Sequence, residues 1–214
     1  MVGAAICRKL VEEHPKRIIV TSILRKEAEE TIATLRGEFP RLPKNYFAVW
    51  GGNIFVRHQL KDTRRDEIMD DPAKRRMFIE DTLEELTEAV IRRSAIHKLL
   101  HAFKPDVIID CINSATAIAY QDIFGRARSV LRSLRKGKKA DSGQSLRENI
   151  EKLLCTLYTP QLIRHVQLLY RVMHACGTKI YVKIGTSGTG GMGLNIPYTH
   201  SEERPSSVLL SKSA

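Results

Sequence analysis

The chain has 214 residues, of which 43% are hydrophobic and 28% charged, and its formal net charge is +11. This length suits one domain, and the composition excludes a disordered chain, a collagen-like fibre and a disulfide-stapled miniprotein. No apolar run approaches the roughly 18 residues that span a bilayer, and the N-terminus does not resemble a signal peptide. We therefore expect a cytoplasmic protein with no membrane partner.

Helices and strands alternate in the first half of the chain. Apolar residues at helical spacing predict a helix over residues 2–14, and the β-branched run Arg17–Thr21 predicts a buried strand. A helix over Glu27–Arg36 and a strand over Tyr46–Trp50 follow. The amphipathic pattern from about Pro72 to Phe103 then predicts a long helical segment.

The second half continues this alternation. Asp106–Ile112 is the plainest strand, and a helical and basic insertion follows near residues 120–155. A helix from Pro160 to about Cys176 leads to a strand over Lys179–Ile184 and a glycine-rich loop over Gly185–Gly193. Strands separated by helices of this length predict an α/β fold with a mainly parallel sheet and flanking helices.

A run of positive charge lies between Gly125 and Ala140, with no acid in it. A solvated basic loop is the interpretation that we favour, and an anionic surface or nucleic acid is the alternative. Because the run has no aromatic residue to stack on bases, nucleic acid is the least favoured partner. Its seven cations are Arg126, Arg128, Arg132, Arg135, Lys136, Lys138 and Lys139.

The sequence predicts no metal site and no disulfide. Its four cysteines are scattered, and none is paired with a histidine at ligand spacing. His97 and His101 are four residues apart, which is a metal-ligand spacing, but no third ligand is placed to complete a site. We expect surface histidines and reduced thiols.

Small or polar residues follow four predicted strands. Ligands of an open parallel sheet bind beyond the carboxyl ends of its strands, so these turns favour a nucleotide-binding crevice. Turns also favour such residues for purely structural reasons. The turns contain Ser22, Arg25 and Lys26; Gly51, Gly52, Asn53 and Ile54; Asn113, Ser114 and Ala115; and Thr186, Ser187 and Gly188.

With these turns, the order of elements resembles the short-chain dehydrogenase/reductase superfamily, in its extended, epimerase/dehydratase-like branch. Gly3 is similar to the third glycine of the Gly-x-x-Gly-x-x-Gly fingerprint, and Asn53-Ile54 to the Gly-Asp-Ile/Val element beside the adenine. Asn113-Ser114-Ala115 resembles the Asn-Ala-Gly-type turn after the fourth strand. The resemblance implies a Rossmann-like domain whose cofactor contacts include these residues.

The resemblance also implies that the domain is partial. If Gly3 is the third glycine, the first strand and two fingerprint glycines belong before Met1, and the family's substrate-binding half belongs after Ala214. We therefore expect residues 1–214 to form a single partial dinucleotide-binding domain, truncated at both ends.

The residues after the first predicted strand bear on the choice of cofactor. By the resemblance this strand is the second of the dinucleotide fold, and a fold that selects NAD places an acid after its second strand to hold the ribose 2′-hydroxyl. Here Ser22, Arg25 and Lys26 come first, and no acid precedes Glu27. A hydroxyl and two cations suit a 2′-phosphate, so we expect NADP in preference to NAD. An ordinary basic helix start is the alternative.

The resemblance implies a catalytic set in the last thirty residues. Ser187 falls where the family keeps its catalytic Ser or Thr, Tyr198 lies close to the spacing of the family's acid/base tyrosine, and Lys212 is the corresponding cation. The family's lysine follows its tyrosine by four residues, whereas Glu202 stands four residues after Tyr198, and a carboxylate there raises a phenol's pKa. A structural tyrosine and a turn serine are the alternatives.

These inferences predict an NAD(P)-dependent oxidoreductase or epimerase. Its substrate would be a small carbonyl or alcohol compound such as a sugar, and its assembly a homo-oligomer. The alternative is a non-catalytic dinucleotide-binding or regulatory domain that has lost the Tyr–Lys pair.

Overall fold

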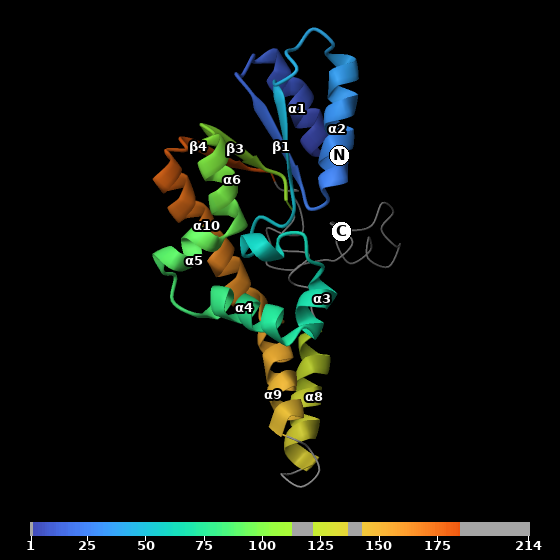
Figure 1. Cartoon of the computed structure of the whole chain (residues 1–214), viewed down its shortest axis with the longest axis vertical. Coiled ribbons are helices and arrows are strands. Elements are labelled where there is room, and N and C mark those ends of the chain that lie inside the picture. The colour runs from blue at the N-terminus through green and yellow to red at the C-terminus, as the bar shows by residue number, and fades with distance from the viewer. Residues whose placement is uncertain (1, 113–121, 137–142, 185–214) are drawn as a thin grey trace, which may run out of the picture. The chain divides into compact units, whose positions relative to one another are not determined.

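The computed structural model describes residues 2–112, 122–136 and 143–184 (Figure 1). These residues form a mixed α/β structure that is mostly helical and contains two pairs of parallel strands. It divides into two compact units. The first unit contains the described residues up to Asp106 together with Arg164–Lys179, and the second contains those of Val107–Ile163 and from Ile180 onward.

The first unit begins with helices and strands in alternation. These elements are α1 (Val2–Glu12), β1 (Ile18–Ser22), α2 (Arg25–Glu38) and β2 (Phe47–Gly51). Strands β1 and β2 are parallel neighbours connected through α2, which confirms the predicted alternation at this point. Buried apolar side chains from these elements and from Tyr46 form a common core: Val11, Ile18, Ile32, Leu35, Tyr46 and Phe47.

Short helices make up the rest of the first unit. They are η1 (His58–Leu60), α3 (Arg65–Asp70), α4 (Pro72–Leu83), α5 (Glu88–Arg93), α6 (Ala95–Phe103) and the C-terminal part of α10 (Tyr158–Cys176). The single helical segment expected from Pro72 to Phe103 is therefore wrong. Thr87 and Ser94 each cap a new helix, by accepting backbone hydrogen bonds from Val90 at 3.4 Å and His97 at 3.2 Å.

An arginine–aspartate cluster joins several of these short helices. Asp81 on α4 accepts hydrogen bonds from both Nε and Nη2 of Arg57, at 2.8 and 3.0 Å, and from Nε of Arg93 at 2.7 Å. Arg164 on α10 donates to the carbonyl of Glu84, and its Nε and Nη1 have no hydrogen-bond partner within the described part of the chain. Burial lowers the pKa of Arg164 below its ordinary value.

A half-buried histidine of α10 stacks on an aromatic ring in the same unit. The ring of His165 stacks on that of Phe55, with 4.1 Å between their centroids. Burial, assisted by the positive charge of Arg65, lowers the pKa of His165 from 6.5 to about 4. His165 is therefore neutral in the folded protein at physiological pH.

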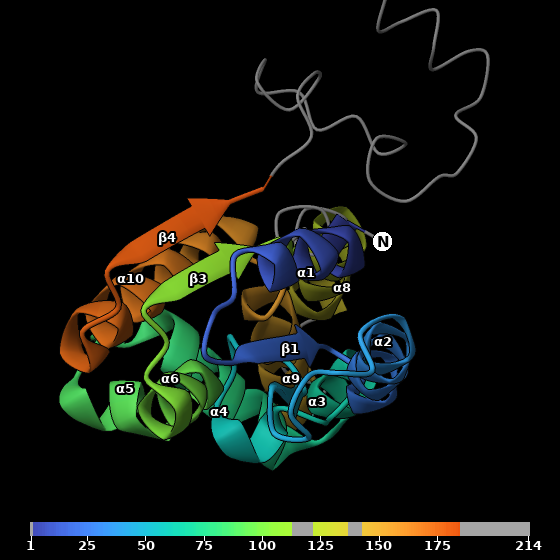
Figure 2. The same ribbon diagram turned by 90° about the horizontal axis from the view of Figure 1, so that it is seen from above.

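The second unit contains the other parallel pair and a pair of packed helices. Its elements are β3 (Val107–Asp110), α8 (Ile123–Lys136), α9 (Gly143–Leu154), the N-terminal part of α10 and β4 (Ile180–Lys183). Strands β3 and β4 lie side by side in parallel (Figure 2). Helices α8 and α9 pack together, and Asn149 donates to Ser133 across them at 3.0 Å. Residues 126–136 of the basic run are thus helical rather than a loop.

The described residues also bear on disulfides, metal binding and membrane-spanning helices. The four cysteines, all within the described residues, form no disulfide bond. In the described ranges, His, Cys, Asp and Glu side chains form no group of three that could hold a metal ion. Nor do those ranges contain a helix of the length and apolarity needed to cross a membrane.

Candidate functional site

The carboxyl ends of β1 and β2 bring two of the predicted turns together. Ser22, the last residue of β1, is in register with Gly51, the last residue of β2. The backbone N–H of Gly52 donates to the carbonyl of Ser22 at 3.0 Å. Residues taken from separate stretches of sequence therefore lie at one edge of the strand pair, which is where parallel sheets bind ligands. We call this edge, with Ser22, Arg25, Lys26 and Gly51–Asn53, the strand-end site.

Two glycines shape the strand-end site. A Cβ atom on Gly51 would lie 2.3 Å from Cβ and 2.7 Å from Cα of Arg25, so only glycine fits between β2 and the start of α2. Gly52 has a φ of 109°, which strains any residue with a side chain. Glycine is thus required at position 51 by close packing and at position 52 by backbone conformation.

Replacing Gly51 with alanine is expected to destabilise the first unit by about 1–3 kcal/mol, because the added methyl group must displace the backbone of α2. Gly37→Ala is the matched control. Gly37 lies within α2, where an added Cβ would meet nothing within 4 Å, and alanine there is expected to be neutral or stabilising by up to about 1 kcal/mol. Urea unfolding followed by the fluorescence of Trp50, the single tryptophan, measures both. Equal effects of the two replacements would contradict the close approach.

The hydroxyl of Ser22 contacts one charged side chain, and two exposed cations follow it in the sequence. Ser22 donates to the carboxylate of Glu27, in the first turn of α2. Arg25 pairs with Glu29 at 2.7 Å and Lys26 with Glu30 at 3.7 Å, and the two basic side chains are 63% and 86% exposed. Ion pairs this exposed contribute little to stability, so both cations are available to a bound anion.

Lys61 is a further cation at this edge that the sequence pattern did not indicate. Its Nζ donates to the carbonyl of Gly51 at 3.1 Å and lies 5.9 Å from the centre of the Trp50 ring. It also pairs with Asp62. Its side chain is 21% exposed. Lys61 directly follows η1, as its C-cap residue, and carries no motif of its own.

Asn53 and Ile54 are engaged in local structure. The side-chain oxygen of Asn53 accepts from the N–H of Phe55 at 3.0 Å, and its own N–H donates to the carbonyl of Lys61 at 2.7 Å. The carbonyl of Ile54 accepts from Ile96 at 2.9 Å. The described contacts of both residues therefore hold the loop after β2 in place.

The other predicted site residues are less informative. Gly3 lies in the first turn of α1, and a Cβ there would meet nothing within 4 Å. The remaining ones lie outside the described residues: Asn113, Ser114, Ala115, Ser187, Tyr198 and Lys212.

The second unit has its own polar cluster at the carboxyl ends of β3 and β4. Asp110 accepts from the hydroxyl of Tyr181 at 2.7 Å and from Nζ of Lys183 at 2.9 Å, and it is 8% exposed. Burial and the hydrogen bond to Asp110 raise the pKa of Tyr181, so its phenol stays protonated. A phenol held in this way cannot serve as a base at neutral pH. Strand register brings these residues together, which is why the sequence pattern did not indicate them.

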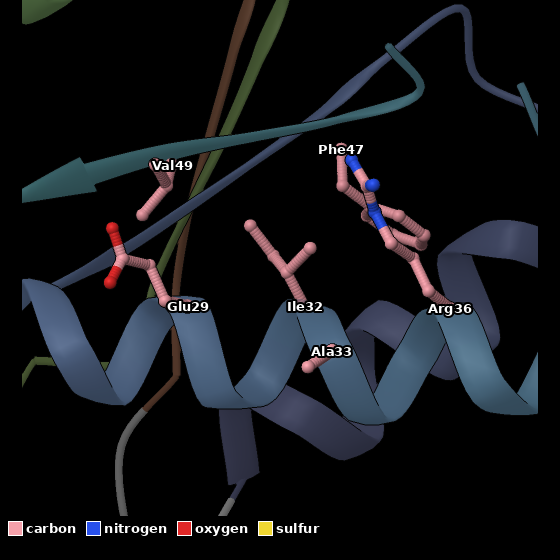
Figure 3. Close-up of a pocket in the computed structure, with 6 residues that line it drawn as sticks. All are labelled: Glu29, Ile32, Ala33, Arg36, Phe47 and Val49. Carbon is pink, nitrogen blue, oxygen red and sulfur yellow. The ribbon is translucent and has the colours of Figure 1, made fainter. Parts of the chain in front are cut away.

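A shallow hollow lies beside the first strand pair (Figure 3). Figure 3 shows Ile32 of α2 pointing toward β2, between Val49 and Phe47, with Glu29 and Arg36 at the two sides. Its lining is mainly apolar, and its charged groups do not converge on one point. The hollow therefore offers less to a polar ligand than the strand-end site does.

Comparisons of the chain with protein-family models, with curated proteins and with solved structures found no match. The function is therefore inferred from the chemistry of the site.

Proposed function

We propose that the chain is a Rossmann-like domain that binds a dinucleotide at the strand-end site, with NADP preferred to NAD. The observation that carries this proposal is the parallel pair β1–β2, connected through α2, with Ser22 and Gly51 in register at its carboxyl ends. Such an edge is where nucleotide-binding α/β domains hold their ligands. The resemblance to extended short-chain dehydrogenases points to the same edge.

The residues of the strand-end site fit a ribose 2′-phosphate. Arg25 offers a planar guanidinium for two parallel hydrogen bonds to phosphate oxygens, and Lys26 adds a second positive charge. Both are exposed and only weakly paired with acids of α2.

NAD is the second candidate, and Glu27 favours it. Its carboxylate already accepts a hydrogen bond from Ser22. A carboxylate in this position can accept a hydrogen bond from a ribose 2′-hydroxyl and would repel a 2′-phosphate. The choice between the two cofactors therefore depends on whether Glu27 or the Arg25–Lys26 pair meets the ribose.

The proposed activity is oxidoreduction or epimerisation of a carbonyl or alcohol substrate. The nicotinamide supplies hydride transfer when it is bound. The chain's own contribution is to hold and orient the dinucleotide at the strand-end site. A domain that binds the dinucleotide without turning over substrate is the alternative.

Binding can be measured by energy transfer from Trp50 to NADPH or NADH, because Trp50 is the single tryptophan and belongs to β2. Arg25→Gln with Lys26→Gln is expected to weaken NADPH binding at least tenfold and NADH binding little, since charge-assisted hydrogen bonds contribute about 1.5–3 kcal/mol. The control is Lys9→Gln with Lys16→Gln, which removes two exposed charges elsewhere.

Each outcome separates the candidates. If Glu27→Gln weakens NADH binding and strengthens NADPH binding, Glu27 meets the ribose and NAD is the cofactor. If neither cofactor binds the unmodified chain, the dinucleotide proposal fails. If both bind, assays of reduced cofactor with carbonyl compounds distinguish the enzyme from the binding domain.

A further inference from the structure

Helix α8 has an apolar side and a basic side. Every large apolar residue falls within about a third of the helix circumference, at a spacing of 3.6 residues per turn. The arginines occupy most of the remainder, and the helix contains no acid. The apolar residues are Ile123, Phe124, Val130, Leu131 and Leu134, and the arginines are Arg126, Arg128, Arg132 and Arg135.

Arginines directly border the apolar side. Arg128 precedes Leu131 by three residues and Arg135 follows it by four, so both are neighbours of Leu131 on the helix surface. Leu131 and its two neighbouring arginines therefore form one continuous surface that offers both apolar contact and positive charge.

Three of the five apolar residues of α8 are exposed although the helix packs on α9, whereas Ile123 and Val130 are half-buried. Phe124 is 76% exposed, Leu131 50% and Leu134 57%. The contact with α9 instead uses another side of α8, which includes Ser133 and its hydrogen bond to Asn149. Helix α10 also exposes apolar side chains on one face, at Ile163, Val166 and Tyr170. On α8 the exposed apolar side chains share a short helix with four arginines, and this combination indicates a docking surface.

We propose that α8 docks on a membrane surface rich in anionic lipids, lying parallel to it with Phe124, Leu131 and Leu134 among the acyl chains. Arg128, Arg132 and Arg135 then meet the headgroup phosphates. A basic, acid-free helix with phenylalanine and leucine on its other face matches the chemistry of such an interface. This departs from the expectation of no membrane partner, which depended on the lack of a spanning segment.

Two other occupants fit the surface less well. A second copy would bring four arginines against four, and like charges oppose that contact. A nucleic acid would satisfy the arginines through its phosphates but would leave the apolar side chains in water. Of these three occupants, an anionic membrane alone matches both sides of α8.

Sedimentation of the full chain with vesicles tests the inference. One set of vesicles contains phosphatidylcholine alone, and the other contains phosphatidylcholine with phosphatidylglycerol. The chain is expected to sediment with the second set and not the first, and to be released as salt is raised. Binding to neither set, or equally to both, would overturn the proposal.

Matched variants assign the binding to α8. Leu131→Ser with Leu134→Ser is expected to weaken binding to the anionic vesicles about tenfold or more. Its control is Val166→Ser with Tyr170→Ser, because those side chains are each 68% exposed on α10. Arg128→Gln with Arg135→Gln is expected to act as strongly, against the exposed pair Arg41→Gln with Lys44→Gln.

The controls also define what contradicts the proposal. If either control pair weakens binding as much as the α8 variant that it is matched with, then net charge or exposed apolar surface in general explains the binding, and not α8. If the chain is a dimer that Leu131→Ser with Leu134→Ser converts to monomers, the face is an interface between copies. Circular dichroism of each variant confirms that α8 and its neighbours remain folded.

Discussion

Asp81→Ala is expected to lower the free energy of unfolding of the first unit by about 2–3 kcal/mol, since it removes the shared acid of a partly buried ion-pair cluster. The side chain of Arg57 is only 13% exposed, and it donates two hydrogen bonds to Asp81. Arg93 pairs with the same carboxylate, and Arg164 is attracted to it. Without Asp81, these arginines repel one another in a half-buried space, and the more exposed and more distant Glu80 is the acid that remains near Arg57.

Urea unfolding followed by Trp50 fluorescence measures this effect. Glu80→Ala is the control, because Glu80 touches Arg57 only at 3.4 Å and is 54% exposed; we expect a loss of no more than about 1 kcal/mol. Adding Arg57→Met to Asp81→Ala is expected to restore part of the stability, because one unpaired buried charge is then absent. Equal losses from Asp81→Ala and Glu80→Ala would contradict this account.

Acid is expected to destabilise the first unit through His165. Its pKa is 6.5 ordinarily and about 4 in the folded protein. Between these values the unfolded chain binds the proton and the folded chain does not, so stability rises with pH across this window. The contribution of neutral His165 is complete above pH 6.5 and is lost as pH falls toward 4. It amounts to at most about 3 kcal/mol.

His165→Phe keeps a ring stacked on Phe55 and removes the titration. We therefore expect the free energy of unfolding of this variant to fall less between pH 7 and pH 4 than that of the unmodified chain, by up to about 3 kcal/mol. His174→Phe, at an exposed position of the same helix, is the control and should leave the pH dependence unchanged. A parallel fall in the unmodified chain and His165→Phe would show that other groups carry the acid sensitivity.

The sequence allowed the elements to be predicted well where local pattern decides them. The β-branched runs at β1 and β3 and the periodic apolar residues of α1 and α10 led to elements within a few residues of those observed. The segment from Pro72 to Phe103 has the apolar spacing of one helix, but it is divided into α4, α5 and α6 by two breaks, after Leu83 and after Arg93. Those breaks depend on side-chain caps and on long-range bonds such as that from Ala95 to the carbonyl of Val56.

The candidate site was predictable only in part. Ser22 and Gly51 could be placed at a ligand-binding edge from strand ends alone, and the structure brings them into register. Three other features of the site could not be predicted, because each depends on how separate segments of the chain pack together. They are the close approach of Gly51 to Arg25, the hydrogen bond from Ser22 to Glu27 and the position of Lys61. The residues expected to carry catalysis lie outside the described ranges, so Ser187, Tyr198 and Lys212 remain predictions.

The order of the chain through its two units has a consequence for biosynthesis. The first unit is completed by residues Arg164–Lys179, and two of these, Leu168 and Val172, are almost or fully buried. A ribosome synthesises all of Val107–Ile163 before those side chains emerge. The N-terminal part of the first unit therefore exposes apolar surface until residues 164–179 have been synthesised. A truncation at Asp106 would leave it in that state permanently.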